Sequence, residues 1–126
     1  MIPVGVAVVE YRGKYLVGVR AAEGTLPGAA EFPGGKCREG ESAAQAACRE
    51  CLEETGLEVI AVDLLMHRQF TYPHGAFDLQ FWLCRPSPRA VCGDDHQGFK
   101  WVPLAELANL DFPEANRPLI AALTQK

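Results

Sequence analysis

A glycine-rich loop that runs directly into a capped helix constrains the fold of this chain more than any other feature. Residues 23–41 contain five glycines and two prolines, a composition typical of a loop. Ser42-Ala43-Ala44-Gln45 then forms a capping-box pattern, and Gly56 suits the left-handed position that follows a helix. The sequence therefore predicts a long loop over residues 23–41 and a helix that begins at Ser42 and ends at Gly56.

Runs rich in β-branched and aromatic residues surround this loop and helix. Residues 4–11 and 14–20 flank the Arg12-Gly13 turn and predict a hairpin. Later segments predict strands over 57–70, 76–85 and 98–102, connections over 71–75 and 85–98, a helical turn over 104–110 and a final helix over 115–126. With 126 residues, 48% of them apolar, the chain is expected to form a single domain over residues 1–126.

The charge balance limits the partners of the chain. A net charge of −4 argues against a nucleic acid polymer or an anionic membrane surface as the ligand. The first apolar run lacks a basic segment before it and is closed by Gly13, so neither an export signal nor a membrane span is expected. Five cysteines without an export signal indicate reduced thiols and a cytoplasmic location.

Three carboxylates crowd one edge of the predicted helix. Glu53 and Glu54 follow Glu50 by three and four residues, so like charges repel there unless cations lie among them. Grouped oxygen donors of this kind suit Mg²⁺ or Mn²⁺, whereas an ordinary solvated helix face is the alternative. Arg49 flanks the cluster and can pair with Glu41 once the loop folds back. The opposite, apolar edge is expected to face a sheet: Ala44, Ala47, Cys48, Cys51 and Leu52.

The segment from Gly35 to Leu57 resembles the Nudix box, G-x5-E-x7-R-E-U-x-E-E-x-G-U, in which U is bulky and aliphatic. Cys51 departs from the pattern at the first aliphatic position, and Leu57 fits the second. All seven fixed positions are present, as Gly35, Glu41, Arg49, Glu50, Glu53, Glu54 and Gly56. Arg20, the run Glu31–Lys36 and the tail from Asp111 to Ile120 also resemble the MutT branch of this family, which hydrolyses oxidised purine nucleoside triphosphates.

This resemblance implies a fold and a metal site. The fold is α+β, an αβα sandwich in which a mixed central β-sheet lies between helices and a loop–helix–loop carries catalysis. The implied cofactor is Mg²⁺, with Mn²⁺ as a substitute. A late-loop carboxylate is also implied, for which Asp95 occupies the matching position and Asp94 is an adjacent competitor. The other implied metal ligands are Gly35 through its carbonyl group, Glu50, Glu53 and Glu54, while Glu41 and Arg49 pair to support the loop.

The resemblance also implies a reaction and its catalytic residues. Water attacks the β-phosphorus of a nucleoside triphosphate and releases a nucleoside monophosphate and pyrophosphate. Glu50 is favoured to orient or deprotonate that water, and Glu53 and Arg49 complete the catalytic set. Arg20 and Lys36 are expected to bind phosphate oxygens, because Arg suits bidentate contacts and Lys acts as a point charge.

Recognition of the base is the more open question. The amide of Asn116 can read a purine edge, yet Asn116 also precedes the last helix and is a natural N-cap. Phe77 with Val6, or Phe32 with Tyr72, can line an apolar slot or belong to the core. The backbone amide of Gly75 is expected to face the base.

Three alternatives remain open on sequence grounds. The Cys48-x-x-Cys51 pair can serve redox chemistry or bind a metal, although no second pair stands at zinc spacing. The chain can be a nucleotide-binding module that has lost catalysis. It can also hydrolyse CTP, dCTP or another nucleoside diphosphate derivative, because the box contacts only the diphosphate and the metal. The expected partner is the nucleotide, and the chain is taken to be a monomer or a homodimer without a known protein partner.

Overall fold

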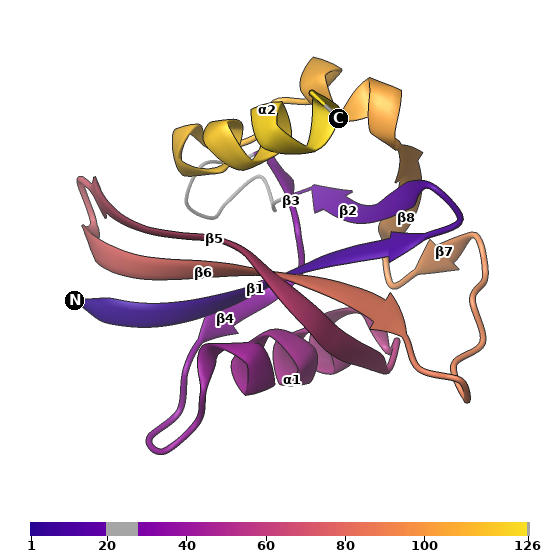
Figure 1. The fold of residues 1–126 in the computed structure, drawn as a ribbon, viewed down its shortest axis with the longest axis horizontal. Coiled ribbons are helices and arrows are strands. Elements are labelled where there is room, and N and C mark those ends of the chain that lie inside the picture. Colours follow the sequence, from indigo (N-terminus) through magenta and orange to yellow (C-terminus); the bar gives the residue numbers. More distant parts are fainter. Residues whose placement is uncertain (20–27, 126) are drawn as a thin grey trace.

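A twisted sheet with a helix on each face forms the body of the protein (Figure 1). The computed structural model describes residues 1–19 and 28–125. Its strands are β1 (Ile2–Tyr11), β2 (Lys14–Val19), β3 (Ala30–Glu31), β4 (Gly34–Lys36), β5 (Val59–Tyr72), β6 (Gly75–Pro86), β7 (Asp95–His96) and β8 (Phe99–Pro103). Its helices are α1 (Ala43–Thr55), the 3₁₀ turns η1 (Leu104–Asn109) and η2 (Glu114–Asn116), and α2 (Arg117–Thr124).

The sheet is mixed, as expected. Its order is β5-β6-β1-β2-β8-β7, with β4 paired to β1 and β3 paired to β2. The β1–β6 pair is parallel, and the other pairs are antiparallel. Figure 1 shows α1 below the sheet and α2 above it, so the predicted αβα sandwich is confirmed.

Strand β1 supplies side chains to both layers, because alternate residues of a strand point to opposite faces. Val8 belongs to the core on the α2 side, where Val4 and Val6 pack against it. Ala7 and Val9 belong to the core on the α1 side. The neighbouring strands β2 and β6 do the same, with Val17 and Phe81 in the α2-side core and Leu16 and Cys84 in the α1-side core.

Helix α1 begins and ends as its sequence predicts. Ser42 accepts a hydrogen bond from the Gln45 backbone amide at 3.1 Å, the Gln45 side chain accepts one from the Ser42 amide at 2.9 Å, and Gly56 adopts φ 76°. The predicted sheet-facing edge is wrong at Leu52, which is 49% exposed, whereas Ala46 is fully buried. The buried face of α1 centres on Ala47 and Cys51, so Leu52, one residue further along the helix, is turned away from the sheet.

The predicted elements between residues 28 and 125 need small corrections. The region predicted as one long loop contains β3 and β4, each too short for an alternating pattern to reveal it. Strand β5 extends to Tyr72 and strand β6 begins at Gly75, so the turn between them consists of Pro73 and His74. The final helix divides into η2 and α2.

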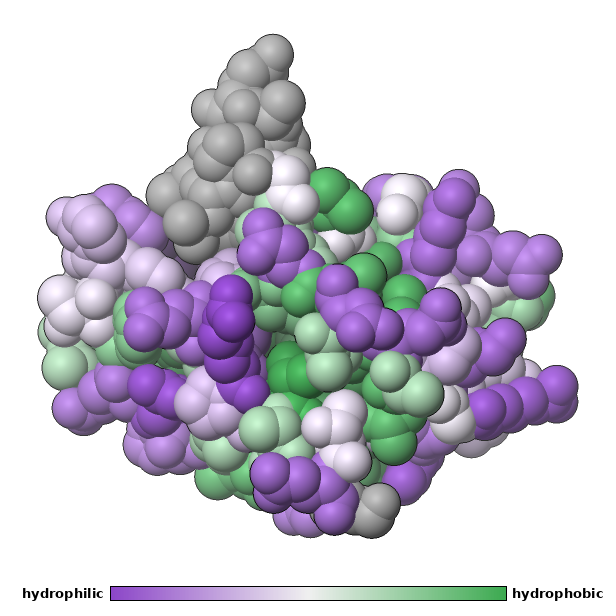
Figure 2. Space-filling model, turned by 90° about the horizontal axis from the view of Figure 1, so that it is seen from above, coloured by the Kyte–Doolittle hydropathy of each residue, from purple (hydrophilic) through white to green (hydrophobic). Residues whose placement is uncertain are grey.

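Among residues 1–19 and 28–125, no helix is long and apolar enough to cross a bilayer. Seen from the side of α2, apolar residues gather near the centre of the face and hydrophilic residues surround them (Figure 2).

Candidate active site

The Arg49 guanidinium makes hydrogen bonds that connect helix α1 to the loop before it. Its Nε and Nη2 donate to the two carboxylate oxygens of Glu41 at 2.7 and 2.9 Å, and Nη2 also donates to the Lys36 carbonyl at 3.1 Å. Its Nη1 donates to Glu50 at 3.0 Å and to Glu53 at 3.1 Å. One side chain therefore ties the loop, β4 and two of the carboxylates together, as the expected Glu41–Arg49 pair requires.

The charge of Glu41 is stabilised by this arrangement. The Arg49 side chain, followed by the Arg38 backbone amide at 2.9 Å, lowers the pKa of Glu41 to about 2. The same pairing raises the pKa of Arg49. Both groups are therefore charged throughout the neutral range, and the loop is held closed by a fixed ion pair.

Glu50 and Glu54 form a second pair of side chains, in which two carboxyl groups lie within hydrogen-bonding distance of each other. A Cβ added at Gly35 would collide with the Glu50 carboxylate, so this carboxylate lies directly against the backbone of β4. Burial, and then the hydrogen bond with Glu50, raises the pKa of Glu54 to about 8, although the Gly34 backbone amide opposes this shift. At neutral pH Glu54 therefore holds a proton.

These residues fit a divalent metal. Carboxylate and carbonyl oxygens are the donors that Mg²⁺ and Mn²⁺ prefer, and a cation would offset both the burial and the like charges that raise the pKa of Glu54. In the part of the chain that the structure describes, no three carboxylate, imidazole or thiol groups converge closely enough to hold a metal as they stand. Arg49 pairs with Glu50 at 3.0 Å and with Glu53 at 3.1 Å.

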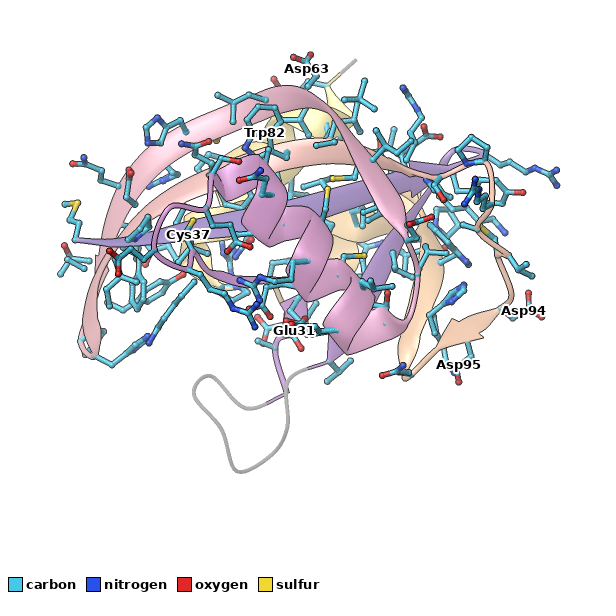
Figure 3. The ribbon with its side chains drawn as sticks, turned by 90° about the horizontal axis from the view of Figure 1, so that it is seen from below. Glu31, Cys37, Asp63, Trp82, Asp94 and Asp95 are labelled. Atoms are coloured by element: carbon cyan, nitrogen blue, oxygen red, sulfur yellow. The ribbon has the colours of Figure 1, made fainter. Side chains whose placement is uncertain are left out.

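A further carboxylate near the cluster comes from β3 rather than from the late loop. Glu31 contributes to the raised pKa of Glu54 by charge repulsion, so it lies within electrostatic reach. Asp95 instead accepts a hydrogen bond from the Gly98 amide at 2.8 Å. Figure 3 shows Glu31 beside α1 and both Asp94 and Asp95 at the outer edge of the molecule. The structure therefore does not bring Asp95 to the carboxylates, and its role as a metal ligand stays a prediction.

Sequence reasoning gave Glu31 no role, although Glu31 stands within the run that resembles the MutT branch. The available signal was its position directly before Phe32 and the two glycines of β4. The sequence could not reveal the position of β3, which is set by its pairing with β2.

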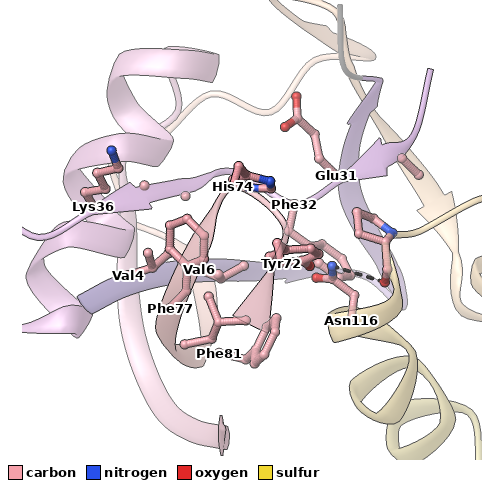
Figure 4. A pocket seen from close by; sticks show the side chains of 15 residues that line it. Val4, Val6, Glu31, Phe32, Lys36, Tyr72, His74, Phe77, Phe81 and Asn116 are labelled. Carbon is pink, nitrogen blue, oxygen red and sulfur yellow. Dashed lines mark hydrogen bonds between the residues drawn. The ribbon is translucent and has the colours of Figure 1, made fainter. Parts of the chain in front are cut away.

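A cavity of about 340 Å³ adjoins this cluster on the α2 side of the sheet (Figure 4). The strand of Gly34 and Gly35 separates the two, and because neither residue has a side chain only backbone lies between them. Lys36 stands at this end of the cavity. The remaining lining is largely apolar and aromatic, and it includes Val4, Val6, Phe32, Tyr72, Phe77 and Phe81.

Asn116 lines the cavity and does not cap α2 with its side chain. Its Nδ2 donates only a long hydrogen bond, 3.5 Å, to the Pro113 carbonyl, so the alternative of a side-chain N-cap is wrong. Among the described residues Gly75 begins β6 and is not part of the cavity wall. Arg20 lies outside the described residues, and its expected phosphate contact stays a prediction.

The cysteines of α1 lie between the helix and the sheet. All five are free thiols. Cys51 is fully buried with its thiol beside the Thr55 hydroxyl, and Cys48 interacts with Cys84 of β6. Together they fill the space between α1 and the sheet, as small apolar residues do.

The loop–helix geometry, with its two glycines and its carboxylates, is shared with a known family. A family model described as the NUDIX domain matches residues 5–122. The chain belongs to the NUDIX domain family. The predicted Nudix hydrolase is thereby confirmed, and hydrolases of this family need divalent metal ions.

Curated relatives and solved structures cover nearly the whole of this Nudix domain. An 8-oxo-dGTP diphosphatase of Escherichia coli is 36% identical over 104 residues, which is 82% of this chain and 81% of the relative. A CTP pyrophosphohydrolase of the same organism is 30% identical over 122 residues, which is 97% and 90%. The solution structure of the E. coli ORF135 protein has a TM-score of 0.78 at 29% identity and covers 99% of this chain and 89% of that one.

The Glu41–Arg49 ion pair is expected to make the free energy of unfolding of this Nudix domain fall as the pH becomes acidic. Because the pKa of Glu41 is lowered to about 2, its stabilising effect is complete above the ordinary value of 4.5 and is lost as the pH falls through 2. We expect Glu41→Gln to be less stable than the wild type at pH 7, and the difference to shrink steadily down to pH 2. Urea denaturation across this range measures it, with exposed Glu39→Gln as the matched control. If the difference in unfolding free energy between the wild type and Glu41→Gln did not change with pH, the ion pair would not be its source.

Proposed function

We propose that this Nudix hydrolase uses Mg²⁺, with Mn²⁺ as a substitute, to cleave nucleoside triphosphates into a nucleoside monophosphate and pyrophosphate, and that 8-oxo-dGTP is its preferred substrate. The observation that carries the proposal is the position of Asn116, which faces an aromatic cavity separated from the carboxylates only by Gly34 and Gly35. A base in the cavity would direct its phosphates toward the carboxylates. The name of the E. coli diphosphatase adds support for the oxidised purine.

The proposed metal ligands are the Gly35 carbonyl group and the carboxylates of Glu50, Glu53 and Glu54. A bound divalent ion there supplies charge neutralisation on the phosphates and lowers the pKa of water. Glu50, fixed by Arg49 at 3.0 Å, orients or deprotonates the attacking water.

The substrate is proposed to bind through residues on three elements. Lys36, at the end of β4, offers its ammonium group to the phosphates, and Arg20 is proposed to do the same. Phe32 and Phe77, which line the cavity, are proposed to contact the two faces of the nucleobase. The amide of Asn116 offers both a donor and an acceptor to the edge of the base. The protein is proposed to work in the cytoplasm, on free nucleotides and not on a nucleic acid polymer.

A second substrate, CTP or dCTP, has a specific argument in its favour. The CTP pyrophosphohydrolase of E. coli aligns with 97% of this chain, a larger share than the 82% that aligns with the diphosphatase. A cavity of this size accepts a pyrimidine as well as a purine, so specificity must come from the polar groups at its wall.

The test compares kcat/KM for 8-oxo-dGTP, dGTP, dCTP and CTP with Mg²⁺, followed by pyrophosphate release. We expect a preference of about two decades or more for 8-oxo-dGTP, or about 2.7 kcal/mol, because a polar group that reads the base edge penalises a mismatched base. Asn116→Ala should reduce this preference without changing the dependence on metal. In ¹⁸O-water the label should enter pyrophosphate.

Two results would each contradict a different part of this proposal. Equal or faster turnover of CTP or dCTP would replace the oxidised purine by a pyrimidine, and label in the monophosphate would place the attack at the α-phosphorus. Exposed Glu106→Gln on η1, away from the cavity, is the control for a change of charge.

A further inference from the structure

Three rings from the β5–β6 hairpin form one wall of the cavity. The rings of Tyr72 and His74 are nearly parallel, 16° apart with centroids at 5.1 Å. Phe77 stands at an angle to both, with centroids 5.5 Å from His74 and 6.0 Å from Tyr72. His74 is an exposed residue of the hairpin turn, and its ring packs against those of Tyr72 and Phe77 at the edge of the cavity.

His74 is the histidine whose hydrogen-bonding groups the protein itself leaves unused. His67 lies 2.7 Å from Asp78, and His96 accepts a hydrogen bond from the Gly93 amide at 3.2 Å. Among residues 1–19 and 28–125, no group makes a hydrogen bond with the ring nitrogens of His74. Because His74 is exposed and lines the cavity, its ring nitrogens are open to a ligand that enters there.

The cavity holds a second polar side chain. Asn116, from η2, lines the same cavity, together with Phe32 (Figure 4). A planar ring in this cavity can pack against apolar surface and still meet polar groups at two places on its rim.

We propose that His74 is a specificity-determining residue, which, together with Asn116, hydrogen-bonds the edge of a nucleobase seated in this cavity. The proposal deepens the proposed function and rests on it, because it identifies how the same cavity distinguishes bases. A neutral imidazole carries one donor and one acceptor. A base whose rim does not match leaves that group unpaired in a partly closed site, which disfavours it by about tenfold to a hundredfold.

Two substitutions separate the polar role of His74 from its packing. His74→Phe keeps a ring against Tyr72 and Phe77 but removes both nitrogens. His74→Gln keeps a donor and an acceptor but loses the stacked ring. His96→Phe is the matched control, because His96 also contacts an aromatic ring, that of Trp101 at 5.9 Å, but lies on β7 outside the cavity.

The measurement is the dissociation constant of 8-oxo-dGMP, dGMP and CMP for each variant by titration calorimetry, together with kcat/KM for 8-oxo-dGTP, dGTP and CTP. We expect the wild type to favour one base. His74→Phe should lower that preference about tenfold or more, His74→Gln should keep most of it, and His96→Phe should leave it unchanged.

Three results would overturn the proposal. A preference kept by His74→Phe and lost by His74→Gln would mean that stacking alone is used. An equal loss of affinity for every nucleotide would mean that His74 only supports the hairpin. Equal binding of all three monophosphates by the wild type would leave no selectivity for His74 to determine. Failure of the proposed function has a different signature, because the wild type would then hydrolyse none of the triphosphates while the binding ratios still report on His74.

Discussion

Replacing Glu50 by Gln is expected to lower kcat about a thousandfold while the fold and nucleotide binding persist. The Glu50 carboxylate lies against the backbone of Gly35 and pairs with Arg49 at 3.0 Å, so it is positioned by contacts on two sides. Gln has the same shape but carries no charge, so it binds a divalent cation weakly and cannot accept a proton from water. Loss of a positioned general base alone typically costs a factor of 10² to 10⁴.

The experiment pairs steady-state turnover with calorimetric titration of a non-reacting nucleotide. Unchanged affinity with lost turnover would separate an enzyme from a module that only binds nucleotides. Exposed Glu39→Gln, in the same loop but without a role in the site, should keep wild-type kcat. A Glu50→Gln variant that retains more than a tenth of wild-type kcat would remove Glu50 from the reaction.

The loop–helix part of the site could be predicted because its contacts are close in sequence. Glu41 and Arg49 are eight residues apart, and the capping box and Gly56 fix where the helix between them begins and ends. Once the helix is placed, the phase of Glu50, Glu53 and Glu54 follows from 3.6 residues per turn. Such features depend little on the rest of the molecule.

The parts that sequence missed all depend on tertiary placement. Glu31 reaches the carboxylates because β3 pairs with β2, and His74 reaches the cavity because a tight two-residue turn folds Tyr72 against Phe77. No local periodicity encodes either contact. The same limit explains Asn116, since only the position of η2 decides whether its side chain caps α2 or faces the cavity.

Leu52 and Asp95 show that the chemical type of a side chain alone does not determine where it lies in the fold. Leu52 is apolar and was expected to face the sheet, yet the buried stripe of α1 is set by close approach to β1, which favours small residues such as Ala47. Asp95 has the right chemistry for a metal but binds the Gly98 amide in its own turn. A short polar side chain in a turn satisfies its own backbone more readily than a distant site.

That close approach of α1 to β1 leads to the largest stability effect that we expect. A Cβ added at Gly5 would collide with the carbonyl oxygen of Ala43 and lie 2.9 Å from the Ala47 amide nitrogen. Both obstacles are backbone atoms, which cannot rotate away as a side chain can. Gly5→Ala must therefore push the whole helix from the sheet, at a cost of about 3 kcal/mol in the free energy of unfolding.

Gly93→Ala is the matched control, because Gly93 has no heavy atom within 4 Å of its added Cβ and no positive φ. Urea denaturation of the two variants and the wild type measures the difference, and we expect Gly93→Ala to lie within about 0.5 kcal/mol of the wild type. The helix shift should also reach the chemistry, since Glu50 is carried on α1 while Gly35 stays on β4. Gly5→Ala should therefore lose kcat even under conditions where it remains folded, because small misplacements of catalytic groups are costly. Wild-type stability in Gly5→Ala would mean that α1 does not rest on β1 at this glycine.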